Sequence, residues 1–229
     1  MRLPGTIAIC VGLVAAACSG PTEQVTGAAE VSVPTGETVV LPEPRAAGVL
    51  SLEEAIAGRR SIREYGDEWL TPEEIGQILW AAQGITQEGG AGRAAPSAGG
   101  TYPLEVYLAT ADGVFRYLPE GHALEVLSDR DVRVPLSQAA LDQEWVAEGA
   151  AVVVVAGVYA RTEEVYGARA ERYVQMEAGH AAQNLLLQAV ALGLGAVPVG
   201  AFDDADVQAA LGIPGDHEPL YLIPVGRPD

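Results

Sequence analysis

The sequence predicts an α+β domain in which helices pack in layers on a sheet. Three observations support this class: two helix starts with capping boxes, at Ser51 and Thr71; an unbroken valine-rich run over residues 150–158; and a long helical stretch over residues 170–194. The apolar run has the length of a strand buried on both faces. With 229 residues, 49% of them hydrophobic, the chain is long enough for one such domain with a sizeable core.

Two helices open the domain, which we expect to span residues 49–229. In the first helix Ser51 supplies the N-cap and Glu54 completes the capping box, and the helix runs to about Arg59. In the second helix Thr71 has the same role, and a proline follows it at the first helical position. Apolar residues at helical spacing after the second start indicate a face turned to the core.

Strands and helices share the rest of the domain. We expect residues 150–158 to be a central strand, and Gly193 and Gly195 to end the long helix. The remaining elements are a loop rich in small residues, a strand, a hairpin, a short strand, a helix and a final strand (residues 89–100, 104–109, 114–117 with 123–127, 196–199, 203–211 and 219–225).

Charge and composition exclude several classes of function. Acidic residues number 31 against 13 basic ones, for a net charge of −18, so nucleic acid and anionic lipid surfaces would be repelled. Every basic residue is Arg and none is Lys, which excludes Schiff-base enzymes, pyridoxal-phosphate enzymes and a GK[ST] phosphate loop. The two cysteines, Cys10 and Cys18, precede the domain, so neither disulfides nor Cys-bound zinc hold it together.

Residues 1–18 are predicted to be a signal peptide, followed by a flexible tether over residues 19–48. The apolar run over residues 7–17 would span ~16 Å as a helix, too short for a hydrocarbon core of ~30 Å. Residues 14–18 resemble a bacterial lipoprotein box, in which Cys18 is lipidated; simple cleavage and a misassigned start codon are the alternatives. We therefore expect a lipoprotein on the extracytoplasmic face of the cell envelope, touching the membrane only through its lipid anchor.

Two segments could bind a ligand. Arg59, Ser61 and Arg63 are spaced two apart, so in extended chain they would project from one face and clamp an anion. The alternative is a solvated basic turn paired with nearby carboxylates. Residues 93–103 are rich in Gly, Ala, Pro and Ser, which either admits a flat ligand at close range or makes an ordinary mobile loop.

Glu177 and His180 form half of a carboxylate-bridged di-iron signature on the long helix. Such a site needs a second copy of the pair and two further glutamates on facing helices. Only His122 and His217 remain, and neither has a suitable partner. We expect no metal, and favour a buried Glu–His pair or a histidine that packs between helices.

Four motifs, in chain order, resemble the nitroreductase superfamily, and in particular its SagB/ThcOx-type dehydrogenase branch. They are Arg-Arg-Ser-Ile-Arg-Glu-Tyr at 59–65, Pro-Ser-Ala-Gly at 96–99 with Tyr-Pro-Leu-Glu-Val-Tyr at 102–107, Arg-Tyr at 172–173 with the helix segment 177–187, and Val-Pro-Val-Gly-Ala-Phe-Asp at 197–203. The resemblance covers about residues 50–228. It implies a nitroreductase-like central sheet flanked by helices, and a homodimer that holds FMN at its interface.

The resemblance also implies a role for individual residues. Arg59 and Ser61 would hold the FMN phosphate, and Arg63 would reach the N1–O2 edge of the flavin. The other implied cofactor contacts are Pro96, Ser97 and Ala98 from the opposite subunit, Gly200 and Ala201 through backbone N–H groups, and Arg227 at the phosphate. Tyr173 and Arg172 match a Tyr and a Lys that abstract a proton in azoline-oxidising relatives. Arg is a poor base, so this departure argues against the same route.

We therefore expect an FMN-dependent oxidoreductase that moves hydride between a small-molecule substrate and flavin N5. The alternative is a non-catalytic lipoprotein that keeps the fold and binds flavin or a partner. The intact arginines favour cofactor binding, whereas the missing Lys and the export signal favour the alternative.

Overall fold

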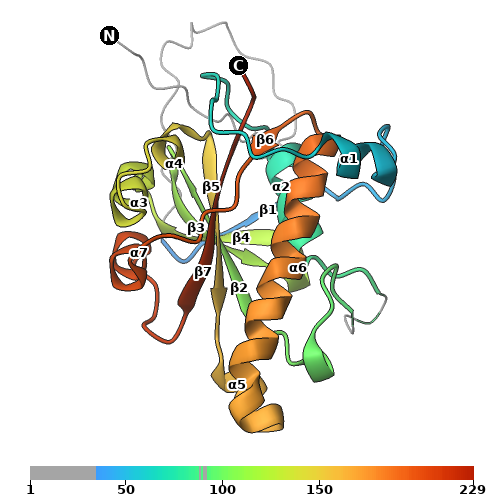
Figure 1. Cartoon of the computed structure of the whole chain (residues 1–229), viewed down its shortest axis with the longest axis vertical. Helices are drawn as coiled ribbons and strands as arrows, with labels where there is room; N and C mark the ends of the chain where they lie inside the picture. The colour runs from blue at the N-terminus through green and yellow to red at the C-terminus, as the bar shows by residue number, and fades with distance from the viewer. Residues whose placement is uncertain (1–34, 88, 90–91) are drawn as a thin grey trace, which may run out of the picture.

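A seven-stranded antiparallel sheet lies at the centre of the computed structural model, which describes residues 35–87, 89 and 92–229 (Figure 1). The strands are β1 (Thr38–Val40), β2 (Leu104–Thr110), β3 (Gly113–Leu118), β4 (Ala123–Ser128), β5 (Ala151–Gly157), β6 (Gly195–Ala196) and β7 (Glu218–Gly226). Their order across the sheet is β1-β4-β3-β2-β5-β7-β6. The expected α+β class, a nitroreductase-like central sheet flanked by helices, is confirmed.

Strand β5 is the valine-rich run, and all of its residues are buried. It pairs with β2 on one side and β7 on the other. Because side chains alternate along a strand, Val153 and Val155 enter one hydrophobic core while Val152 and Val154 enter the other. One continuous apolar segment thereby serves both faces of the sheet.

Helices cover both faces of the sheet (Figure 1). The helices are α1 (Leu52–Gly58), α2 (Pro72–Gln83), α3 (Arg133–Ala139), α4 (Trp145–Glu148), α5 (Ala160–Tyr166), α6 (Ala170–Ala191) and α7 (Asp204–Leu211). Helices α1, α2 and α6 pack together on one face, and α3, α4 and α7 lie on the other. None of the helices in the described ranges is long and apolar enough to cross a membrane.

The predicted helix starts are confirmed. Ser51 and Glu54 form a reciprocal capping box at α1, and Thr71 and Glu74 form another at α2. The long helix α6 has 22 residues. It ends just before Gly193, which adopts a φ of 72° in the left-handed region.

Three helices and one strand were not predicted. Helices α3, α4 and α5 lie in stretches for which the sequence predicted no helix. Strand β1 lies within the expected tether, and it pairs with β4 at the edge of the sheet. Each of these elements is short, so its pattern alone carries little signal and packing decides its structure.

The domain therefore begins before the expected boundary near Val49. Leu41 is buried, and the Gln77 side chain on α2 bonds to both backbone groups of Arg45, at 2.8 and 3.0 Å. The His122 ring bonds to the carbonyl of Pro42 at 2.9 Å. Residues 36–45 thus form a strap that is held against the domain, and they are not part of a flexible tether. The predicted signal peptide, Cys18 and residues 19–34 lie outside the described residues.

The strap predicts a pair of stability effects. Leu41→Ala should lower the free energy of unfolding by about 2–3 kcal/mol, because Leu41 is 7% exposed and packs in the core. Val40→Ala is the matched control: Val40 is 75% exposed, so we expect a change below about 0.5 kcal/mol. Urea denaturation of both variants measures the difference. Equal and small effects would show that the strap does not contribute to folding.

Candidate functional site

Residues 59–66 run along the outer edge of the sheet, beside β6 and the C-terminal residues. Ile62 donates its N–H to the carbonyl of Ala196 at 3.2 Å, and Gly66 donates to the carbonyl of Arg227 at 2.9 Å. The Tyr65 hydroxyl donates to the carbonyl of Ile62 at 2.6 Å. Burial raises the pKa of Tyr65, so this hydroxyl stays protonated and remains a donor.

Two glycines allow this edge segment to approach the sheet. A Cβ on Gly195 would lie 2.6 Å from a methyl carbon of Ile62, and one on Gly226 would lie 2.9 Å from the Tyr65 ring. Both distances are shorter than packed carbon atoms tolerate. With Ile62 and Tyr65 turned inward in this way, Ser61 and Arg63 are exposed. The predicted two-residue spacing holds only around Ile62, because Arg60 and Glu64 are also exposed and Arg59 is half-buried.

Arg59 and Arg63 carry no carboxylate partner among the residues that the structure describes. Arg59 follows the last residue of α1 and is half-buried, and Arg63 lies over the ring of Trp145 at 5.5 Å. In a chain of net charge −18, carboxylates are abundant. The two cations therefore stand as an uncompensated positive edge, which suits an anionic ligand.

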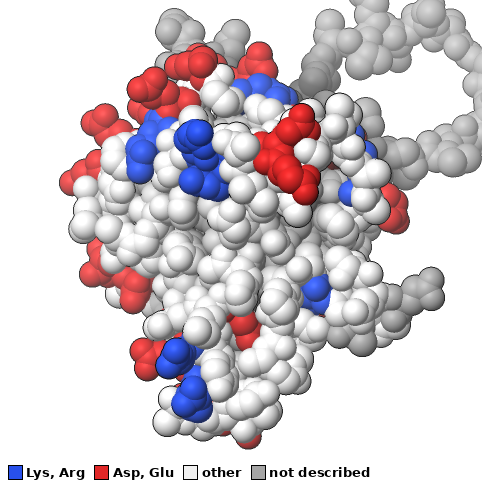
Figure 2. All heavy atoms as spheres, turned by 45° about the vertical axis from the view of Figure 1, so that its right-hand side comes forward, with Lys and Arg blue, Asp and Glu red and all other residues white. Residues whose placement is uncertain are grey.

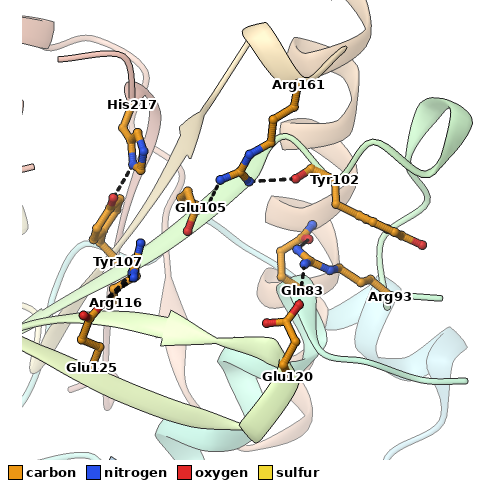
Figure 3. A network of polar contacts seen from close by, with 10 residues as sticks. All are labelled: Gln83, Arg93, Tyr102, Glu105, Tyr107, Arg116, Glu120, Glu125, Arg161 and His217. Carbon is orange, nitrogen blue, oxygen red and sulfur yellow. Dashed lines mark hydrogen bonds and ion pairs between the residues drawn. The ribbon is translucent and has the colours of Figure 1, made fainter. Parts of the chain in front are cut away.

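The arginines of a second cluster are compensated (Figure 3). Arg93, Arg116 and Arg161 line a cavity of about 230 Å³ beside β2 and β3. Each is paired with a glutamate: Arg93 with Glu120, Arg116 with Glu125, and Arg161 with Glu105. Nearby, Tyr107 and His217 form a separate buried hydrogen bond. The ion pairs of this cavity hold strands and loops together, and they leave it without a free cation.

Arg227 also differs from Arg59 and Arg63. Its Nε lies 2.7 Å from Glu68, and its guanidinium contacts both carboxylate oxygens of Glu74, at 2.9 and 3.2 Å. Glu74 simultaneously caps α2. Arg227 therefore links the C-terminal residues to the start of α2, and its charge is compensated.

The Gly200–Ala201 turn lies against the connection between α3 and α4. Both residues are exposed, and Gln143 donates its side-chain N–H to the carbonyl of Ala201 at 3.0 Å. Trp145, two residues after Gln143, contacts the Arg63 guanidinium through its ring. This connection brings Arg63 and Ala201 to one place. Gln143 and Trp145 could not be recognised from the sequence, because no motif or predicted element covered them.

The loop that contains Pro96, Ser97 and Ala98 is anchored on α6 by Glu177. The Glu177 carboxylate accepts from the backbone N–H of Ala98 at 2.7 Å and from the Ser97 hydroxyl. The same hydroxyl accepts from the N–H of Tyr102 at 2.9 Å. Glu177 is 5% exposed, and this burial raises its pKa. The carboxylate is therefore bonded to the loop and not to His180, which is exposed. Glu177 is buried as expected, but the expected buried Glu–His pair and the expected packing of His180 between helices are wrong.

Tyr173 lies near the same loop, at the start of α6. Its hydroxyl accepts from Arg169 at 3.0 Å, and its ring meets the ring of Tyr166 edge-on at 5.1 Å. The Tyr166 hydroxyl lies against Gly99. Arg172 is exposed, and it makes no ion pair or hydrogen bond with any residue in the described ranges. Arg169, not Arg172, is the cation at Tyr173.

The predicted site residues thus fall into two groups within one chain. Arg59 and the edge segment adjoin the far end of α6, where Gly58 meets Val190, whereas the Pro96–Ala98 loop is bonded at Glu177. Thirteen residues of helix separate Glu177 from Val190, which corresponds to about 20 Å. A single chain does not bring the two groups together.

Comparison with known proteins defines the class: the chain is an oxidoreductase-family domain with the nitroreductase fold. It belongs to the nitroreductase family, whose sequence model matches residues 56–227. It is 46% identical over 184 residues to "Putative nitroreductase MJ1384" of Methanocaldococcus jannaschii, covering 78% of this chain and 91% of that protein.

Solved structures show the same fold. A nitroreductase-family crystal structure from Ralstonia eutropha has a TM-score of 0.77 and 30% identity, over 86% of this chain and 93% of that one. The NADPH:FMN oxidoreductase of Vibrio harveyi, complexed with NAD+, has a TM-score of 0.59 and 25% identity, over 78% of this chain and 69% of that one. These relatives support the nitroreductase family and not a particular branch within it.

The raised pKa of Glu177 predicts a pH-dependent stability difference. The ionised form of Glu177 is disfavoured in the fold. The free energy of unfolding of the wild type therefore falls as the pH rises through the raised pKa of this group. Glu177→Gln keeps an acceptor for Ala98 but does not titrate. In urea denaturation, the free energy of unfolding of the variant should equal that of the wild type near pH 4 and exceed it increasingly toward pH 7. Parallel pH profiles would contradict this, and Glu171→Gln, which removes an exposed carboxylate of the same helix, is the control.

Proposed function

We propose that the protein is an FMN-dependent oxidoreductase acting on a small-molecule substrate. The observation that carries this proposal is the edge formed by Arg59, Ser61 and Arg63, where two guanidinium groups lack a described carboxylate partner in a strongly acidic chain. Membership of the nitroreductase family and the likeness to an NADPH:FMN oxidoreductase support the same cofactor.

The residues present fit FMN. Arg59 and Ser61 would hold the phosphate through charge-assisted hydrogen bonds. Arg63 would place a cation at the N1–O2 edge, where reduced flavin carries negative charge. The exposed Gly200–Ala201 turn offers backbone groups to the N5–O4 side. When bound, FMN supplies hydride transfer at N5, and the chain supplies binding, orientation and charge.

The Pro96–Ala98 loop and Arg227 would act less directly. The Ser97 hydroxyl and the Ala98 N–H are occupied by contacts within the chain, so the loop would contribute surface contacts such as the exposed Pro96 ring. Arg227 would have to share its guanidinium with Glu68 and Glu74 or leave them. We therefore assign the main phosphate contact to Arg59 and Ser61.

If the edge formed by Arg59, Ser61 and Arg63 (the arginine edge) binds FMN, removing either arginine should lower the affinity for FMN. Arg59→Ala and Arg63→Ala should each weaken FMN binding about tenfold or more, because each removes a charge-assisted bond of about 1.5–3 kcal/mol. Arg130→Ala is the control, since Arg130 is also exposed and without a described carboxylate partner. Calorimetric titration with FMN measures all three. Unchanged affinity in both edge variants would remove the arginine edge as the cofactor site.

We also propose a homodimer, in which the Pro96–Ala98 loop of one chain meets the arginine edge of the other. The separation of the two groups by about 20 Å along α6 supports it. The face formed by α1 and α6 supports it too: its central area is free of charged side chains (Figure 2). That face holds a groove of about 680 Å³ and the exposed apolar residues Val49, Leu52 and Ile56.

The dimer proposal predicts a sharp contrast between two surface variants. Ile56 on α1 and Val134 on α3 are exposed to nearly the same extent, 57% and 58%. Ile56→Asp should give a monomer and lose FMN, because it buries a charge in the interface. Val134→Asp, on the opposite layer of the domain, should keep both. Light scattering with flavin absorbance reads the outcome, and a wild-type monomer that holds FMN would contradict the proposal.

Within the family we propose the SagB-type dehydrogenase branch, on the strength of the motifs at residues 59–65 and 172–187. Tyr173, which meets the guanidinium of Arg169, is our candidate catalytic residue for proton transfer, and Arg172 remains a second candidate. Residues 35–229 should co-purify with flavin absorbance. Bleaching by NADH, NADPH or a thiazoline would identify the donor. Bound flavin that none of them reduces would favour the non-catalytic alternative.

We further propose that the protein is exported and anchored to the cell envelope through lipid on Cys18. Two or three acyl chains hold a protein firmly, at ~0.8 kcal/mol per buried CH₂. Cys18→Ser should move the protein from the membrane fraction to a soluble or unprocessed form and leave FMN binding unchanged. Fractionation with mass measurement of the N-terminus is the test. Wild-type protein found in the cytoplasm with Met1 intact would contradict the proposal.

A further inference from the structure

The Arg63 guanidinium lies over the ring of Trp145. The guanidinium carbon lies 5.5 Å from the ring centroid, within the range of a cation–π contact. Trp145 begins α4, and its ring packs against the hydrophobic core on that face of the sheet. It therefore offers a fixed platform for an exposed and otherwise unpaired side chain.

An aromatic platform holds a cation differently from a carboxylate. A carboxylate uses N–H donors of the guanidinium and cancels its charge, as Glu68 and Glu74 do at Arg227. A ring face adds no negative charge and takes up fewer N–H donors than a bidentate carboxylate does. Arg63 on Trp145 therefore keeps its donors and its charge available for an electron-rich ligand edge.

The indole N–H of Trp145 gives an independent indication. Its Nε1 is buried and has no hydrogen-bond partner among the described residues. A buried donor without a partner is unfavourable, so hydrogen bonding does not explain an indole at this position. The aromatic face remains as the group that makes contact.

The surroundings place this pair at the proposed flavin site. The connection that precedes Trp145 also carries Gln143, which holds the carbonyl of Ala201 at 3.0 Å. Leu141 and Asp142 in the same connection adopt φ values of 59° and 57°, a strained conformation for residues other than glycine. A strained connection that contacts both Arg63 and Ala201 sets the spacing between them.

We propose that Trp145 is a positioning residue, which holds Arg63 uncompensated at the N1–O2 edge of the flavin and thereby raises both cofactor affinity and flavin midpoint potential. This inference rests on the proposed function. Without the ring, Arg63 would be free to turn toward Glu148. Glu148 is an exposed carboxylate, and its charge, like that of Arg63, influences the pKa of Tyr65. The cation would then be neutralised or displaced.

The test compares four single variants and one double variant in the full chain. Trp145→Leu should raise the FMN dissociation constant about fivefold, as expected for loss of one cation–π contact, and shift the midpoint potential of bound flavin to a more negative value. Trp145→Phe keeps a ring face and removes the unpaired N–H, so it should stay within about twofold of the wild type. Trp69→Leu is the matched control, because Trp69 carries Arg133 in the same way at 5.7 Å.

A double-mutant cycle separates positioning from a general effect on the fold. In an Arg63→Ala background, Trp145→Leu should have no further effect on FMN affinity or potential. If Trp145→Leu has no effect in the wild type, or the same effect in the Arg63→Ala background, the inference is wrong. A Trp145→Phe variant as weak as Trp145→Leu would equally overturn it. If the wild-type chain binds no flavin, the proposed function fails first and this inference fails with it.

Discussion

The positive edge depends on how closely residues 61–66 pack against two glycines. Gly195 accepts Ile62, and Gly226 accepts Tyr65, at distances that leave no room for a Cβ. Because Ile62 is held inward, its neighbours Ser61 and Arg63 are turned outward. A larger residue at either glycine would push the segment from the sheet. The orientation of the candidate cofactor residues is therefore set by the backbone of β6 and β7 more than by the arginines themselves.

Helix α6 couples the two groups of candidate residues. Near its start, Glu177 bonds the loop at Ser97 and Ala98, and near its end Val190 meets Gly58 just before Arg59. A rigid helix fixes the distance between them, so one chain cannot close a site from both groups. In the proposed dimer a second copy would do so, packing on the face of α1 and α6, whose central area is free of charged side chains (Figure 2). In that dimer, the same helix would separate the two groups within one chain and offer a surface for the partner.

Much of the fold could be predicted from local sequence, and the site only in part. Capping boxes at Ser51 and Thr71 act within four residues, and the valine run of β5 is apolar whatever its neighbours, so both were visible. Strand β1 exists only because β4 pairs with it and α2 binds the strap that follows. Likewise, neither the carboxylates at Arg227 nor the ring beneath Arg63 follows from a motif. They depend on residues that are distant in sequence and meet only in the fold.

The ion pairs of the arginines identify those cations that are structural. At Arg93, Arg116, Arg161 and Arg227, glutamates compensate the charge and tie elements together. Exposed arginines such as Arg130 and Arg172 also lack a carboxylate partner among the described residues, so Arg63 is distinguished by its contact with the ring of Trp145 and not by the missing ion pair alone. The net charge of −18 repels an anionic cofactor at long range, although salt screens this repulsion beyond ~10 Å. Recognition must then come from contacts at short range, where Arg59 and the ring-supported Arg63 leave their N–H donors free.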